Sequence, residues 1–265
     1  MSSEVKTTKF FTWIHSDVDK WYDARNFESD AYNKAQNIFF VADNTKELFA
    51  SQFPEWKDKC DVIKNVLNKD IIIQKSQETL SDVPFDRDFF NIVSIGRFTE
   101  AKAFDRVIDV AKYLKSKSHK FKWYLIGSGE LFESINKQVQ NDNMKDSVIL
   151  LGAKNNPYPY IRMSDLVVVS SLNESQPMVI LEALTLSKPV VSTGYPSAKE
   201  ILQGGKYGYI CENDVDSLCV AVERVLSDKD LYDNLLIGAR EYEYDNEEIL
   251  HKLNSFILTK ESKFS

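Results

Sequence analysis

The chain has 265 residues, 43% of them apolar and 28% charged, a balance that excludes a wholly disordered or fibrous protein. At about 150 residues per domain, this length allows one large domain or two modest ones. The net charge of −7 disfavours nucleic-acid binding as the main function, because such proteins need a basic face. No apolar run reaches the roughly 18 residues of a membrane span, although local basic clusters leave peripheral attachment to a membrane open.

The cysteines and the N-terminus indicate the cellular setting. Three cysteines cannot form a disulfide framework, and with three histidines at their spacings they fit no zinc site. The first thirty residues contain no basic segment followed by an apolar stretch, so no secretory signal is predicted. We expect a reducing, cytoplasmic setting and neither a metal nor a resident cofactor.

The first third of the chain gives a weak pattern. Strands are predicted at 10–14 and 38–41, with a helix over 45–53 and a short strand at 62–63. These strands are fewer than the roughly four to six of a usual sheet, so residues 1–66 predict a partial Rossmann-like N-terminal unit. Residues 67–88 predict a polar linker, since they include a turn-prone run at 81–85.

Downstream, strand-like runs alternate with helical periodicity, a pattern typical of parallel strands joined by crossover helices. The predicted strands are 91–95, 123–126, 148–151, 166–169, 189–191 and 207–211. The predicted helices include 158–163, 177–187, 218–226 and 230–243. Residues 89–243 therefore predict a complete doubly wound α/β domain, followed by a C-terminal helix and tail over 244–265.

Glycines follow four of these strands, at Gly96, Gly127, Gly152 and Gly194. Ligands of parallel sheets bind beyond the C-terminal ends of the strands, where glycine permits close approach to the backbone. A tight turn explains any single glycine equally well, but four at equivalent positions favour a ligand crevice.

Two cations flank the loop after the first of these strands. Arg97 and Lys102 precede a predicted helix, and cations beside free helix N–H groups suit a diphosphate. Each of them taken alone is explained better as a solvated surface charge. The next loop, Gly127-Ser-Gly129, lacks the third glycine and the distant acid of a dinucleotide site, which disfavours a dehydrogenase.

A nearly all-apolar predicted helix carries one carboxylate, Glu182. Such a helix is normally buried, and a buried carboxylate needs a partner, which ribose hydroxyls or a local lysine or arginine would supply. Pro177 suits the first turn, and Asn173 or Ser175 the cap. Glu174, eight residues before Glu182, would meet a ligand above the helix N-terminus.

The motifs Gly96-Arg97-x4-Lys102, Gly127-x-Gly129, Glu174-x7-Glu182 and Lys188-Pro-Val-Val191 together resemble the family-4 retaining glycosyltransferases of the GT-B fold. The resemblance covers roughly residues 8–258. It implies that Glu174 contacts the donor sugar, Glu182 the ribose, and Arg97 and Lys102 the diphosphate of a nucleotide-sugar donor. The other donor-binding positions that it implies are Gly96, Gly127, Gln176, Pro177, Met178 and Val179.

The resemblance extends to the N-terminal unit, where the run 11–17 matches a strand that ends in a cleft histidine. His15 is the matching residue, although a lone histidine after a strand is more often structural. Ala103 and the pair Pro196-Ser197 replace glycines that are common in the family. Family members carry about half a Rossmann-like domain before this strand, so we expect a fragment, a truncated gene, or an acceptor site supplied otherwise.

The resemblance implies retaining transfer of a sugar to a glycan or lipid-linked acceptor in cell-surface polysaccharide synthesis. The catalytic residues would be His15, Arg97, Lys102 and Glu174, with cations stabilising the leaving diphosphate. The implied location is cytoplasmic, with peripheral association at the inner membrane surface. Two alternatives stay open: a truncated, non-catalytic nucleotide-sugar-binding remnant, and a nucleotide-sugar epimerase of the GT-B fold.

Overall fold

The computed structural model describes residues 9–15, 29–80 and 85–258. The chain divides into two compact units, each described separately. Unit 1 comprises Met1–Leu67 together with Asp245–Ser265, and unit 2 comprises Asn68–Tyr244. The predicted C-terminal helix therefore belongs with the N-terminal unit.

Unit 2 contains a six-stranded parallel sheet, as the sequence predicts. Its strands are β4 (Phe90–Ile95), β5 (Phe121–Ile126), β6 (Val148–Gly152), β7 (Leu166–Val169), β8 (Val190–Thr193) and β9 (Tyr209–Cys211). Their order is β6-β5-β4-β7-β8-β9, so the chain builds outward from β4 in one direction and then restarts on the other side of β4 with β7. The sheet thus has a topological switch point between β4 and β7, where parallel α/β sheets bind ligands.

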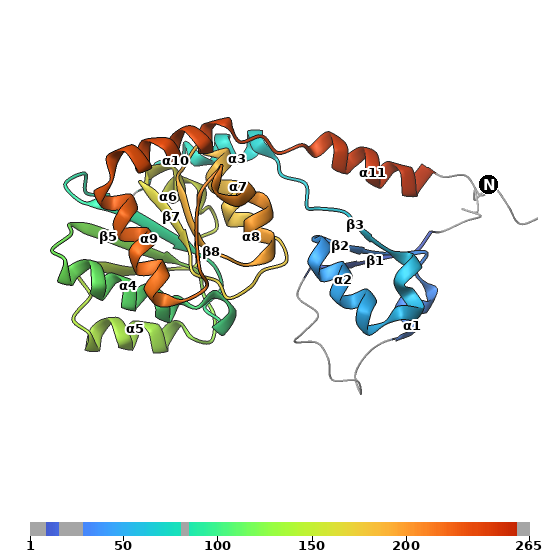
Figure 1. Ribbon diagram of the computed structural model, residues 1–265, viewed down its shortest axis with the longest axis horizontal. Helices are drawn as coiled ribbons and strands as arrows, with labels where there is room; N and C mark the ends of the chain where they lie inside the picture. The colour runs from blue at the N-terminus through green and yellow to red at the C-terminus, as the bar shows by residue number, and fades with distance from the viewer. Residues whose placement is uncertain (1–8, 16–28, 81–84, 259–265) are drawn as a thin grey trace, which may run out of the picture. The chain divides into compact units, whose positions relative to one another are not determined.

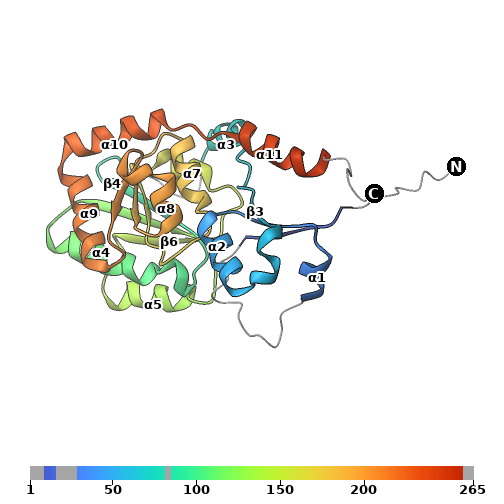
Figure 2. The ribbon, with the colours of Figure 1, turned by 45° about the vertical axis from the view of Figure 1, so that its right-hand side comes forward.

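Helices cover both faces of this sheet (Figures 1 and 2). One face carries α4 (Phe104–Ser116), α5 (Phe132–Asn141) and α9 (Val215–Ser227), and the other carries α6 (Tyr158–Met163), α7 (Met178–Thr185) and α8 (Pro196–Ile201). The remaining elements of the unit are α3 (Lys69–Ser76), α10 (Lys229–Glu241), η3 (Glu100–Lys102) and η4 (Gln203–Gly205). In β4, Ile92 packs into one core and Val93 into the other. Burial on both faces explains why the strands are apolar runs without alternation.

The segment expected to be a polar linker over 67–88 contains the helix α3, which corrects that expectation. The Asn68 side chain caps the helix by accepting a hydrogen bond from the N–H of Ile71 at 3.0 Å. Ile72 is buried, and Arg162 Nε of α6 donates to the carbonyl of Ser76 at 2.6 Å. Its three isoleucines are consecutive, and Ile71 and Ile73 are exposed, so the helix shows no clear helical periodicity in the sequence. Residues 81–84 lie outside the described residues.

Unit 1 contains a three-stranded parallel sheet in the order β1-β2-β3. Its elements are β1 (Phe11–Ile14), α1 (Ser29–Lys34), β2 (Asn37–Phe40), α2 (Asp43–Gln52), η2 (Pro54–Lys59), β3 (Cys60–Val62) and α11 (Asn246–Leu258). In β2, Ile38 and Phe40 pack with Phe49 of α2 and Trp56 of η2. Phe39, between them in the strand, instead contacts Phe256 of α11 at a ring distance of 5.0 Å. The helix α11, although distant in sequence, therefore packs against the strand β2.

Asn246 attaches the start of α11 to the end of the N-terminal segment. Its Nδ2 donates to the carbonyl of Leu67 at 2.6 Å, and its Oδ1 accepts from the N–H of Leu67 at 3.0 Å. We expect Asn246→Ala to lower the opening free energy of α11 by about 1–2 kcal/mol, because both hydrogen bonds are lost. Amide hydrogen exchange in α11 measures this change, with the exposed Asn254→Ala as control. Equal exchange in the two variants would contradict the attachment.

Candidate functional site

The loops after β4 and β5 pack closely at the C-terminal end of the unit 2 sheet. Gly127 follows β5 with φ of +147°, and a Cβ atom there would lie 1.8 Å from the carbonyl oxygen of Gly96. Only glycine fits this contact, so the tight-turn explanation accounts for Gly127. Gly152 has a left-handed φ of +69°, but an added Cβ atom there would meet no atom within 4 Å. The loops after β4 and β5 are therefore in direct backbone contact at this end of the sheet.

The loop after β4 carries the two predicted cations. Arg97 is exposed, and within the described part of the chain its guanidinium has no hydrogen-bond or ion-pair partner. The Lys102 side chain folds back over Gly96, where an added Cβ would lie 3.2 Å from Lys102 Cδ. The next residue, Ala103, is left-handed with φ of +49°. That conformation costs a non-glycine residue about 1–2 kcal/mol, which explains why glycine is common at this position in the family that the sequence resembles.

Lys102 meets Glu174 across the switch point. The Lys102 ammonium lies 2.5 Å from Glu174 Oε2, and the two side chains are 22% and 13% exposed. Ser171 Oγ donates to the other carboxylate oxygen at 2.6 Å. The sheet order places the loops after β4 and β7 side by side, and the ion pair joins them. Two of the four predicted catalytic residues are thus in direct contact.

Glu182 lies on α7 and is mostly buried. Tyr158, at the start of α6, donates a hydrogen bond to Glu182 Oε1 at 3.3 Å. Burial raises the pKa of the Glu182 carboxyl to about 7, and the Tyr158 hydrogen bond opposes that rise. Among the residues that the structure describes, no lysine or arginine forms an ion pair with Glu182, in contrast to one of the two alternatives considered from the sequence. The carboxylate is therefore desolvated without a compensating cation, an arrangement that hydroxyl donors from a ligand would stabilise.

The N-terminus of α7 differs from the prediction. Pro177, rather than Asn173 or Ser175, occupies the N-cap position, and it forms no side-chain cap hydrogen bond. Gln176 Nε2 donates a hydrogen bond to Tyr244 Oη at 2.9 Å. Met178 is partly buried and Val179 is buried.

His15 follows β1 in unit 1 and is exposed. Its ring stacks with that of Trp13 at a centroid distance of 6.5 Å. Its part in any reaction stays a prediction.

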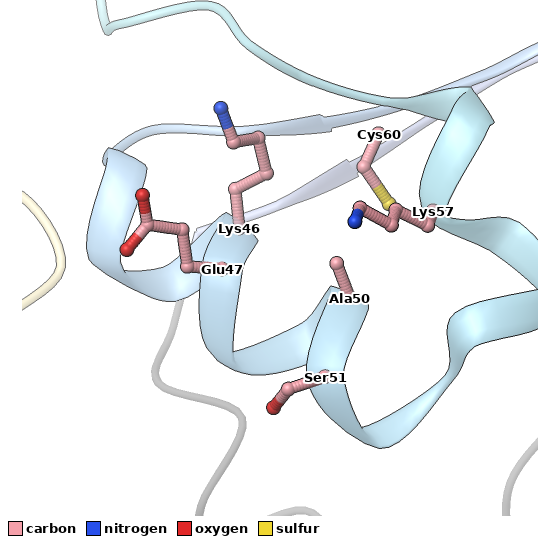
Figure 3. A pocket seen from close by; sticks show the side chains of 6 residues that line it. All are labelled: Lys46, Glu47, Ala50, Ser51, Lys57 and Cys60. Atoms are coloured by element: carbon pink, nitrogen blue, oxygen red, sulfur yellow. The ribbon is translucent and has the colours of Figure 1, made fainter.

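A cavity of about 500 Å³ lies in unit 1 between α2, η2 and β3. Figure 3 shows Lys46 rising from α2, with Lys57 and Cys60 approaching from η2 and β3. Lys46 is paired with Asp43 at 3.1 Å. Burial raises the pKa of the Cys60 thiol to about 11, so this thiol is neutral at physiological pH and is a poor nucleophile.

Within residues 9–15, 29–80 and 85–258, no three His, Cys, Asp or Glu side chains gather closely enough to bind a metal ion. None of the helices in the same ranges combines the length and the apolar character needed to cross a membrane.

Several contacting residues were not predicted. Tyr158, Ser171 and Ser197 touch the two glutamates or their backbone, yet each lies in another segment or in an ordinary loop. A serine or tyrosine has no distinctive spacing in the sequence, so only the packing of the strands could identify these contacts.

Two curated relatives of this chain are named as glycosyltransferases. A glycosyltransferase of Methanocaldococcus jannaschii, described as uncharacterized, is 30% identical over 195 residues, covering 70% of this chain and 48% of that protein. The Campylobacter jejuni N-acetylgalactosamine-N,N'-diacetylbacillosaminyl-diphospho-undecaprenol 4-alpha-N-acetylgalactosaminyltransferase is 27% identical over 202 residues, covering 76% and 53%. The chain spans about half the length of these curated relatives.

The fold also matches solved structures. A point mutant of Staphylococcus aureus TarM, in complex with fondaparinux, alpha-GlcNAc-glycerol and UDP, superposes with a TM-score of 0.79 at 20% identity, covering 96% of this chain and 52% of that one. The predicted GT-B-like α/β fold is therefore confirmed. A sequence profile of the family described as "Glycosyl transferases group 1" matches residues 75–242, well over half of the chain. The chain belongs to the glycosyl transferases group 1 family.

Proposed function

We propose that this chain binds a uridine-diphosphate sugar in unit 2 and takes part in retaining sugar transfer of the family-4 type. The observation that carries the proposal is the Lys102–Glu174 pair at the switch point, at 2.5 Å between loops of different strands. A cation and a carboxylate at this position suit a ligand with both a diphosphate and sugar hydroxyls. The structural relative TarM was solved with UDP, which supports uridine as the base.

The proposed roles follow the chemistry of each group. Arg97 and Lys102 stabilise the negative charge that develops on the leaving diphosphate, and the N-terminus of α7 adds positive potential. Glu174 accepts hydrogen bonds from the sugar hydroxyls and Glu182 from the ribose. The leaving phosphate oxygen takes the proton of the acceptor hydroxyl, so the reaction balances without a resident cofactor, and His15 positions the reactants.

The acceptor is proposed to be a glycan or a lipid-linked sugar. The Campylobacter relative carries diphospho-undecaprenol in its name, and such an acceptor is anchored in a membrane. The reaction would then take place at a membrane surface, with the protein peripherally attached. Cell-surface polysaccharide synthesis is the corresponding process.

The proposal is tested by incubating the protein with UDP-N-acetylglucosamine or UDP-glucose, alone and with a prenyl-diphosphate-linked sugar in detergent. We expect transfer that depends on the acceptor, and an α-configured product by the coupling constant of its anomeric proton. A changed sugar without acceptor would indicate an epimerase. UDP binding without any turnover would support a non-catalytic donor-binding protein.

Arg97→Ala tests the diphosphate assignment by binding alone. Because the exposed guanidinium is available to the phosphates, we expect UDP affinity to fall about tenfold or more, which is roughly 1.4 kcal/mol. Titration calorimetry measures the change, and Arg87→Ala, an exposed arginine before β4, is the matched control. Unchanged UDP affinity in Arg97→Ala would remove Arg97 from the site.

A further inference from the structure

The segment that carries Glu174 is held by side chains from elsewhere in unit 2. Residues 170–177, between β7 and α7, form no helix or strand, so their carbonyl groups need external partners. Three of these carbonyls accept from side chains: Ser171 from Thr193 Oγ1 at 2.6 Å, Leu172 from Asn213 Nδ2 at 2.7 Å, and Glu174 from Ser197 Oγ at 2.5 Å.

The three donors come from different parts of the fold. Thr193 ends β8, Ser197 lies in the first turn of α8, and Asn213 follows β9. Thr193 and Ser197 are buried, at 0% and 3% exposure. Arg106 Nη1 donates to Asn213 Oδ1 at 2.6 Å, which orients the amide so that its Nδ2 faces Leu172. The segment is therefore fixed by the framework of the sheet before any ligand arrives.

Ser197 is the donor that acts on Glu174 itself. The Glu174 carboxylate is bound by Lys102 and Ser171, and the Ser197 hydroxyl holds the backbone carbonyl of the same residue. We propose that Ser197 is a positioning residue, which sets where the Glu174 carboxylate lies relative to Lys102 and the donor sugar. This inference rests on the proposed function of Glu174.

The Ser197 hydroxyl distinguishes this sequence from the family that it resembles. The pair Pro196-Ser197 occupies a position where two glycines are common in the family that the chain resembles, and glycine has no side-chain donor. A glycine there would leave the Glu174 carbonyl without this partner. Serine at position 197 therefore restricts its own backbone more than glycine would, and its hydroxyl fixes the Glu174 carbonyl.

The test compares the effect of Ser197→Ala on UDP-glucose, which carries the sugar, with its effect on UDP, which does not. In Ser197→Ala we expect the rate of transfer from UDP-glucose, and the affinity for it, to fall about tenfold, since small displacements of a positioning group are costly. UDP affinity should stay within about twofold, because the proposed phosphate and ribose contacts do not depend on this carbonyl. Ser197→Cys keeps a weak donor and should recover part of the loss.

Two controls distinguish positioning from general damage. Ser192→Ala removes another fully buried hydroxyl, which bonds to the Thr193 carbonyl at 3.0 Å and does not touch the 170–177 segment. It should leave both affinities unchanged. In a Glu174→Ala background, Ser197→Ala should add no further loss, because a residue acting through Glu174 is not additive with it.

The outcomes also separate this inference from the proposed function. A wild-type protein that binds UDP and UDP-glucose, with Ser197→Ala indistinguishable from Ser192→Ala, would overturn the positioning role alone. Equal losses for UDP and UDP-glucose in Ser197→Ala would do the same. A wild-type protein that binds neither ligand would overturn the donor site on which the inference depends.

Discussion

Lys102→Ala is expected to lower the rate of sugar transfer about a hundredfold or more while the protein stays folded. Removing one preorganised charge from a site of developing negative charge has an effect of this size in other enzymes. In this protein the Lys102 side chain is 22% exposed and its ammonium lies 2.5 Å from Glu174 Oε2, so the charge is oriented and the side chain is partly shielded from water. Steady-state transfer from a UDP-sugar at saturating acceptor measures the loss.

Two control variants separate the effect of the Lys102 charge from the loss of any lysine. Lys122→Ala removes a lysine near the start of β5, at the opposite end of that strand from Gly127, and should leave transfer unchanged. Lys102→Arg keeps the charge and should recover part of the rate. A Lys102→Ala variant with the wild-type rate would refute the role of Lys102 in stabilising the leaving group.

Glu182→Gln is expected to stabilise the unliganded protein at pH 8 by up to about 3 kcal/mol, with little change at pH 4.5. Burial raises the pKa of Glu182 from 4.5 to about 7. Between those values the folded state binds more protons than the unfolded state, so this carboxyl makes the wild type lose stability as the pH rises through about 7. At 1.36 kcal/mol for each pH unit, glutamine removes that loss because it does not ionise.

Urea denaturation of the variant and the wild type at several pH values measures this difference. Glu130→Gln, at an exposed position, removes the same charge and should give a small difference that barely depends on pH. Glu182→Gln should also weaken UDP binding, since a neutral amide is a weaker acceptor than a carboxylate. A stability difference between Glu182→Gln and the wild type that is equal at pH 4.5 and pH 8 would refute the buried, ionising carboxylate.

Strand prediction succeeded in unit 2 for a simple physical reason. A parallel sheet covered on both faces produces apolar runs such as 166–169, which the structure places at Leu166–Val169. The motif spacings and the glycines after the strands also follow from local chain geometry. The helix α3 was missed because its three isoleucines are adjacent, Ile71–Ile73, and do not recur at the spacing of a helical face.

The sequence alone determined the α/β class, most strand positions and the residue types of the proposed nucleotide-sugar site, because these depend on neighbours along the chain. Which residues touch was decided by the order β6-β5-β4-β7-β8-β9, which brings the loops after β4 and β7 together. Contacts such as Lys102–Glu174, Tyr158–Glu182 and Ser197–Glu174 join residues 23 to 72 positions apart. Hydrogen bonds and ion pairs act over a few ångströms in space, and that proximity exists only after the sheet has formed.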